Sequence, residues 1–415
     1  MSLSPIRWKG ASWRGAVTQT AGAPLPLWHH SFVGNFTILV HRTQSAAMQT
    51  STLPASSTGS SATMPPVDEK KLNAFVGKMV GDLGAAASGA LVLLGDRLGL
   101  YAALAGQGSA TSTQLAERAH CYERYVREWL ACQAASGYVD YDSATETFSM
   151  NPEQAAVLAD PNSPVAMVGG YFAMASIYID EPQVETAFRT GRGIPWGDHH
   201  NCLFCGTERF FRPGYEANIV QHWLPALDGV IAKLERGAHV ADVGCGWGAS
   251  TFIMARAFPK SKFTGFDLHA ESIEESNRKA QHAGLDNLKF AVASAQNFTG
   301  LEYDLVTVFD ALHDMGNPVG VASQICRHLK PDGTLMLVEP MAGDSLSANL
   351  NPVSRVFYAF STMICTPCAM SQGLGIALGA QAGEARLRKV LEEAGFTRIR
   401  RAAETPFNMI LEVRP

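Results

Sequence analysis

The sequence predicts an α/β protein in which a seven-stranded, doubly wound sheet follows an N-terminal helical, winged-helix domain. Two observations support this fold class. From His239 onward, short apolar strands alternate with helical segments, which is typical of a mostly parallel sheet covered on both faces. Between residues 113 and 150, two helical segments precede a short hairpin, the order of elements in a winged helix. At 415 residues, the chain is long enough for two domains and a terminal segment.

Residues 1–66 differ in composition from the rest of the chain. They contain four basic and no acidic residues, and they are rich in Ser, Thr, Gly, Pro and Ala. We expect a disordered or targeting segment. Translation from Met48 or Met64 is the alternative. The eight cysteines of so long a chain indicate a reducing compartment, so the expected location is cytoplasmic, or mitochondrial or plastid if residues 1–66 are a transit peptide.

Residues 67–150 predict a winged-helix domain suited to dimerisation. Thr113 can cap a helix over Gln114–Ala119, and a second helix is expected over Glu123–Ala135. That second helix mixes two Glu with two Arg and has no basic stripe. Beyond residue 67 the chain has 29 basic and 38 acidic residues, which disfavours a nucleic-acid surface. No stretch of 18 uninterrupted apolar residues occurs, so no membrane span is expected.

Residues 151–235 predict a helical connector, and residues 236–415 predict the α/β domain. Its expected strands lie at His239–Val243, Phe263–Phe266, Leu288–Val292, Leu305–Phe309, Thr334–Glu339, Thr397–Arg401 and Met409–Val413. The last two strands are close enough in sequence to include an antiparallel partner.

The first strand ends in a glycine-rich turn that carries the clearest chemical signal. In doubly wound sheets, ligands bind at the carboxyl ends of the strands. The turn contains Asp242, Gly244, Gly246 and Gly248, and the next strand ends at Asp267. Dinucleotide sites use a G-x-G-x-x-G spacing that seats a pyrophosphate, whereas here the third Gly comes one residue earlier and an acid precedes the first. This pattern favours S-adenosylmethionine, whose methionine end is cationic.

These residues, together with the strand beginning at Tyr303-Asp304 and the turn at Lys330-Pro331-Asp332-Gly333, resemble class I S-adenosylmethionine-dependent methyltransferases with a Rossmann-like sheet. From about Asp68, the arrangement is similar to mainly bacterial small-molecule methyltransferases with an N-terminal winged helix. The resemblance implies that S-adenosylmethionine is the cofactor. The cofactor-binding residues it implies are Asp242, Gly244, Gly246, Gly248, Asp267, Leu268, Ser294, Ala295, Gln296 and Asp310.

Leu312-His313-Asp314 follows the fourth strand and resembles the segment that holds the catalytic histidine of plant O-methyltransferases. We expect His313 to act as the general base and Glu339, which ends the fifth strand, to orient it. A loop histidine that only packs near the cofactor is the alternative. Met315 stands where the plant pattern has a tryptophan.

The sequence gives fewer indications of the residues that bind the molecule receiving the methyl group. The apolar stretch Val353–Leu378 is expected to overhang the site, and the substrate candidates are Tyr171, Tyr215, Tyr358 and Met363. Residues 199–205 contain an H-H-x-C-x-x-C cluster and residues 365–368 a second C-x-x-C, but methyl transfer needs no metal and we expect none.

The predicted function is therefore transfer of a methyl group from S-adenosylmethionine to a small molecule, at oxygen. Transfer to nitrogen or carbon is one alternative, and a winged-helix transcriptional regulator that senses S-adenosylmethionine is another. The expected assembly is a homodimer that binds neither nucleic acid nor membrane.

Overall fold

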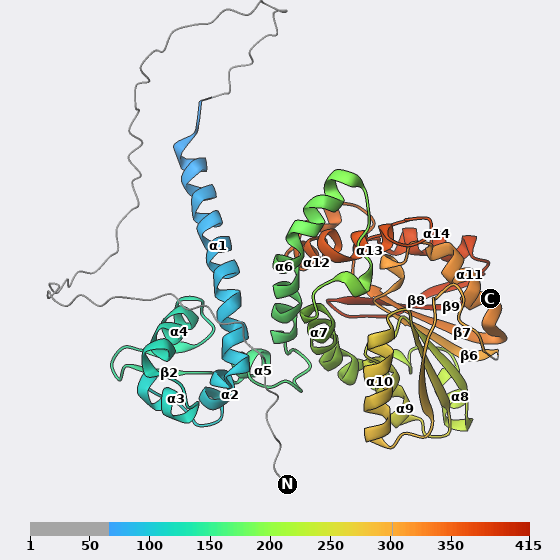
Figure 1. Ribbon diagram of the computed structural model, residues 1–415, viewed down its shortest axis with the longest axis horizontal. Helices are drawn as coiled ribbons and strands as arrows, with labels where there is room; N and C mark the ends of the chain where they lie inside the picture. Colours follow the sequence, from blue (N-terminus) through green and yellow to red (C-terminus); the bar gives the residue numbers. More distant parts are fainter. Residues whose placement is uncertain (1–65, 301) are drawn as a thin grey trace, which may run out of the picture. The chain divides into compact units, whose positions relative to one another are not determined.

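The computed structural model describes residues 66–300 and 302–415 (Figure 1). The predictions for the N-terminal segment, including the targeting signal, lie outside these residues. The long helix α1 (Glu69–Arg97) begins at Asp68, whose carboxylate accepts the backbone N–H groups of Lys70 and Lys71. Its N-terminal half exposes apolar side chains. Among the described helices, α1 is long and apolar enough to cross a membrane by length and composition alone.

The winged helix packs its own core. It comprises α1, α2 (Leu100–Ala105), α3 (Ser112–Arg118), α4 (Glu123–Ala135), β1 (Asp140–Asp142) and β2 (Thr147–Ser149). Helix α3 begins at Thr111 rather than the predicted Thr113, because Thr111 and Gln114 form a reciprocal capping box. Helix α4 has the predicted bounds. Leu115, Leu130 and the edge-on pair Tyr101–Trp129 fill the core of this domain.

Helical segments connect the winged helix to the sheet. They are α5 (Pro152–Leu158), α6 (Val168–Thr190), α7 (Cys202–Asn218) and α8 (Val230–Arg236). Helices α6 and α7 approach so closely that a Cβ at Gly169 would lie 2.4 Å from the backbone of Arg209. The Arg209 guanidinium also forms two hydrogen bonds with Asp96 at the end of α1, at 2.9 and 2.8 Å. Helix α7 is thereby fixed to the winged helix.

The seven-stranded sheet confirms the predicted fold class. Its strands are β3 (His239–Val243), β4 (Lys262–Asp267), β5 (Leu288–Val292), β6 (Tyr303–Phe309), β7 (Leu329–Pro340), β8 (Arg398–Glu404) and β9 (Asn408–Arg414). Their order is β5-β4-β3-β6-β7-β9-β8, and β9 runs antiparallel to both of its neighbours.

Helices cover both faces of this sheet, so its central strands are apolar on both sides. In β7, Leu335 and Leu337 join one buried cluster, whereas Met336 and Val338 join the other. The remaining helices are α9 (Ala249–Ala257), α10 (Ala270–Ala283), α11 (Pro318–His328), α12 (Pro352–Phe360), α13 (Thr366–Met370) and α14 (Glu384–Glu393).

Candidate active site

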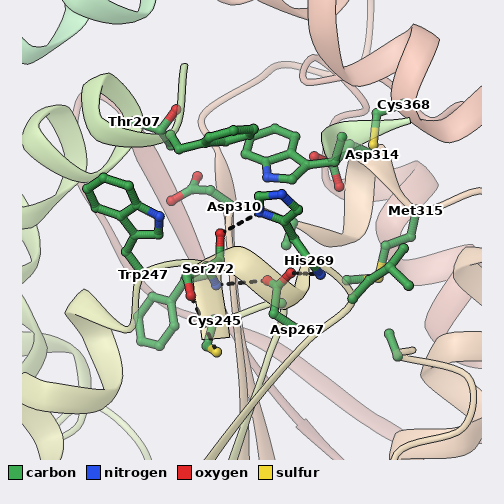
Figure 2. Close-up of a pocket in the computed structure, with 18 of the residues that line it drawn as sticks. Thr207, Cys245, Trp247, Asp267, His269, Ser272, Asp310, Asp314, Met315 and Cys368 are labelled. Atoms are coloured by element: carbon green, nitrogen blue, oxygen red, sulfur yellow. Dashed lines mark hydrogen bonds between the residues drawn. The ribbon is translucent and has the colours of Figure 1, made fainter. Parts of the chain in front are cut away.

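A cavity of about 330 Å³ opens at the carboxyl ends of β3, β4 and β6 (Figure 2). This is the edge at which ligands bind in doubly wound sheets. The predicted residues that line it are Gly244, Gly246, Asp267, Leu268, Ser294, Ala295, Gln296, Asp310 and Tyr215. The structure thus brings together residues that are far apart in the sequence.

The glycine-rich turn forms the floor of the cavity. Gly244, Gly246 and Gly248 all have positive φ, between 51° and 78°, which other residues adopt only with strain. A Cβ at Gly246 would meet no atom within 4 Å, so the backbone there is open to a ligand. At Gly248 a Cβ would instead lie 2.5 Å from the Phe290 ring. Gly248 therefore serves packing and does not line the cavity.

Asp242 was predicted to face the cofactor, but its side chain does not line the cavity. It is 1% exposed, and its carboxylate accepts hydrogen bonds from the hydroxyls of Ser250, Thr251 and Thr307 at 2.6–2.9 Å. Burial raises its pKa, an effect that the three hydroxyl donors oppose. In this structure Asp242 holds β3, β6 and α9 together beneath the turn.

Asp267 does line the cavity, at the end of β4. One carboxylate oxygen accepts the Gly246 N–H and the other accepts the His269 N–H, both at 2.8 Å. The carboxylate is therefore fixed against the glycine-rich turn (Figure 2). Each oxygen still has a lone pair for a ligand, as recognition of two ribose hydroxyls requires.

The segment Ser294–Gln296 lines the wall next to Asp267. The Ser294 hydroxyl accepts the backbone N–H of Gln296 at 3.3 Å, and the side-chain oxygen of Gln296 accepts a hydrogen bond from the Asn317 side-chain amide at 3.1 Å. The roles predicted for these residues toward a cofactor stay predictions.

Asp310 follows β6 and has φ +49°, a conformation that few residues other than glycine adopt. Its two carboxylate oxygens accept hydrogen bonds from the Tyr215 hydroxyl and the Asn408 amide, both at 2.7 Å. Burial raises the pKa of Asp310 to about 7, although the bond from Tyr215 opposes the shift. Strained backbone of this kind persists where surrounding contacts hold it, often at functional sites.

His313 and Glu339 do not line the cavity. His313 Nδ1 lies 2.6 Å from a Glu339 oxygen, and the other oxygen of Glu339 accepts the Leu312 N–H at 2.9 Å. Both side chains are nearly inaccessible to solvent. Burial lowers the pKa of His313, but the interactions with Glu339 and Cys365 together outweigh burial and raise this pKa well above its ordinary value. His313 as the general base stays a prediction, and its ring lies behind the cavity wall.

Of the four substrate candidates, Tyr215 alone lines the cavity. Tyr171 lies toward the winged helix, where its hydroxyl is 3.1 Å from that of Tyr138. The Tyr358 hydroxyl accepts a 3.5 Å hydrogen bond from Asn349, and Met363 packs in the cluster that contains Phe204. A contact of these three residues with substrate remains a prediction.

Sequence reasoning missed most of the wall opposite the sheet. It is built from the 195–197 segment, one face of α7, and α13, and its residues include Pro195, Trp196, Phe204, Glu208, Phe211 and Cys368. Glu208 and Phe211 are three residues apart, and Phe204 and Phe211 seven apart, which is one face of a helix. This helical spacing could be recognised in the sequence. It did not show, however, whether that face of the helix lines a cavity or packs in the hydrophobic core.

The H-H-x-C-x-x-C cluster serves the fold. His199 Nδ1 lies 3.0 Å from the buried Asp180 carboxylate, which also accepts the His200 N–H. Within residues 66–300 and 302–415, no three His, Cys, Asp or Glu side chains are grouped as metal ligands.

Comparison with known proteins assigns both domains. Residues 234–395 match a family model described as a methyltransferase domain, and residues 86–160 match one described as an Rv2258c-like winged HTH domain. The chain is 32% identical over 129 residues to the ubiquinone biosynthesis O-methyltransferase of Paracidovorax citrulli. That match covers 30% of this chain and 52% of the relative, so the chain spans about half the length of this relative.

Two solved structures share the fold across most of the described chain. The mitomycin 7-O-methyltransferase has a TM-score of 0.57 at 21% identity, covering 83% of this chain and 99% of its own. Human N-acetylserotonin methyltransferase, solved with S-adenosylmethionine, has a TM-score of 0.60 at 17% identity, with coverages of 86% and 99%. Together with the strand order and the cavity, these matches identify the chain as a class I methyltransferase-fold protein with an N-terminal winged-helix domain.

Proposed function

We propose that this protein is an S-adenosylmethionine-dependent methyltransferase that methylates a small molecule at oxygen. One observation carries the proposal: a single cavity is lined by the open backbone of Gly246, the fixed carboxylate of Asp267 and the strained Asp310. The O-methyltransferases among the similar proteins support the choice of oxygen.

The residues present fit the cofactor. The turn at Gly246 admits a ligand next to the backbone, and Asp267 offers lone pairs for the ribose hydroxyls. When bound, S-adenosylmethionine supplies an electrophilic methyl carbon, whose transfer to an acceptor oxygen breaks a carbon–sulfur bond, releases the thioether and requires removal of the acceptor's proton.

Asp310 is the group that we assign to take this proton. It lines the cavity, and a pKa of about 7 suits a base that works near neutrality. The Tyr215 and Asn408 donors hold its carboxylate in place. We assign His313 and Glu339 as a positioning pair, because Glu339 holds both the His313 ring and the backbone of Leu312, two residues after Asp310.

The test is calorimetric titration with S-adenosylhomocysteine, followed by incubation with labelled S-adenosylmethionine and a metabolite extract. We expect micromolar binding and a labelled small molecule whose mass rises by one methyl group. Absence of both would overturn the proposal.

We propose that the protein is a homodimer in which the two copies of α1 pack against each other. The N-terminal half of α1 exposes Phe75, Val80 and Leu83 by 61–71%, a larger apolar stripe than a monomer usually leaves in water. A second copy of the helix would cover it.

Binding of DNA by the winged helix is disfavoured. The two arginines of α4 pair with glutamates of the same helix, Arg127 with Glu123 at 2.8 Å and Arg124 with Glu128 at 2.6 Å. Arginines neutralised in this way contribute little to phosphate binding. The regulator hypothesis therefore ranks below the enzyme.

A further inference from the structure

The cavity that we assign to methyl transfer has a one-sided charge. Of the described residues that line it, none is Lys or Arg and one is a histidine, His269, whereas four are carboxylic acids: Glu208, Asp267, Asp310 and Asp314. Unpaired carboxylates in a partly closed cavity are costly unless something compensates their charge. The four acids differ in what compensates them.

Three of the acids have partners within the protein. Asp267 accepts two backbone N–H groups, and Asp310 accepts hydrogen bonds from Tyr215 and Asn408. Glu208 lies 3.3 Å from the guanidinium of Arg212, one turn further along α7.

Asp314 differs, because its carboxylate has no hydrogen-bond or ion-pair partner among the described residues. It ends the short turn Leu312–Asp314, and Figure 2 shows it beside Cys368 at the cavity. Its position is fixed from both sides, since Glu339 accepts the Leu312 N–H and the Gln372 amide donates to the Asp314 carbonyl at 3.2 Å. Burial raises the pKa of Asp314 to about 7, although the charge of the neighbouring His313 opposes the shift.

Aromatic rings line the same cavity. Trp196, Phe204, Phe211, Tyr215 and Trp247 all contribute to its wall. The faces of such rings attract cations, most strongly where water is excluded. An unpaired carboxylate next to an aromatic wall is a combination that selects a ligand with one positive charge and an apolar body.

We propose that the methyl acceptor is an aromatic or apolar molecule carrying a protonated amine, and that this amine pairs with Asp314. The inference rests on the proposed function, since it assigns the remainder of the cofactor cavity to the acceptor. It sets the substrate class without fixing which atom receives the methyl group.

S-adenosylmethionine itself carries positive charge. The experiment must therefore distinguish whether Asp314 pairs with the cofactor or with the amine of the methyl acceptor. Binding is measured by calorimetry, with and without saturating S-adenosylhomocysteine, for two matched pairs of ligands: tyramine against tyrosol, and tryptamine against tryptophol. Within each pair, an ammonium replaces a neutral hydroxyl. We expect at least one amine to bind about ten-fold or more tightly than its neutral counterpart.

Asp314→Asn should remove this preference while leaving the affinity for S-adenosylhomocysteine within two-fold, roughly the error of such a comparison. Asp314→Glu should restore part of it, which separates loss of charge from misfolding. Asp286→Asn, at an exposed position before the amino end of β5, is the matched control and should change neither affinity, because the cavity opens at the carboxyl ends of the strands.

Three results would overturn the inference: equal affinities within both pairs, no binding by either amine, or an Asp314→Asn variant that keeps the preference but loses S-adenosylhomocysteine. The last result would assign the carboxylate to the cofactor. Failure of the unmodified protein to bind S-adenosylhomocysteine would instead count against the proposed function. The titrations without S-adenosylhomocysteine would still show whether the amines bind more tightly than their neutral counterparts.

Discussion

At the scale of single residues, Asp310 combines features that rarely occur together. Its backbone is strained, its carboxylate is fixed by two neutral donors, and it lines the cavity. We expect Asp310→Asn to lower kcat/KM about 100-fold, the usual contribution of a positioned base. Activity of the unmodified protein should rise as pH increases through about 7, where Asp310 loses its proton.

His313→Ala provides the contrast for that measurement. If His313 only positions the segment that follows Asp310, the variant should lose rate but keep the rise near pH 7, whereas Asp310→Asn should lose the rise. The reverse pattern in the pH profiles would assign the base to His313, as the sequence predicted.

The same group makes stability depend on pH. The pKa of Asp310 is raised from 3.8 to about 7 in the folded state, so the folded protein binds the proton more tightly than the unfolded chain. The contribution of Asp310 to stability is therefore largest below about pH 4, and it is lost as pH rises through about 7. Thermal unfolding should show the melting temperature of Asp310→Asn overtaking that of the parent protein as pH increases from 5 to 8. A constant difference between them would contradict this assignment.

At the scale of elements, the turn after β3 depends on Gly248 for packing. Gly248→Ala places a Cβ 2.5 Å from Phe290 at φ +78°, and we expect about 2–4 kcal/mol lower stability in urea unfolding, together with weaker binding of S-adenosylhomocysteine. Gly284→Ala is the matched control. It has φ +63° but no atom within 4 Å of the new Cβ, so only about 1–2 kcal/mol should be lost. Equal losses would mean that contact with Phe290 is unimportant.

The elements also show what the sequence could and could not predict. All seven strands and the bounds of α4 were predictable, because apolar alternation and the glycine after α4 are local signals. The position of Asp267 beside the glycine-rich turn followed from the parallel order of β3 and β4. The burial of Asp242 beneath the turn could not be predicted, because the hydroxyls that saturate its carboxylate come from α9 and β6. The wall formed by Trp196 and α7 depends on tertiary packing, for which no local pattern exists.

At the scale of the whole molecule, the exposed stripe on α1 predicts the assembly. Light scattering after gel filtration should give a dimer for the full chain, and Phe75→Ser with Leu83→Ser should give a monomer, because both side chains are mostly exposed in the single chain. Lys70→Ser, on the same helix, should leave the dimer intact. A monomeric parent protein would refute this assembly, and recovery of the full chain with membranes would point to lipid as the cover of α1.

The excess of acidic over basic residues beyond residue 67 predicts weak binding to DNA. Fluorescence anisotropy with a labelled duplex at low salt should show no saturable binding below roughly the micromolar range, where nonspecific DNA-binding proteins begin to bind. Tight binding that weakens steeply as salt increases would favour the regulator.

Helix α7 has a double attachment: Arg209 ties it to the end of α1, while Glu208 and Phe211 face the cavity. A graft that replaced the winged helix would therefore need a carboxylate at the position of Asp96, because loss of that ion pair would loosen the helix that carries Glu208 and Phe211.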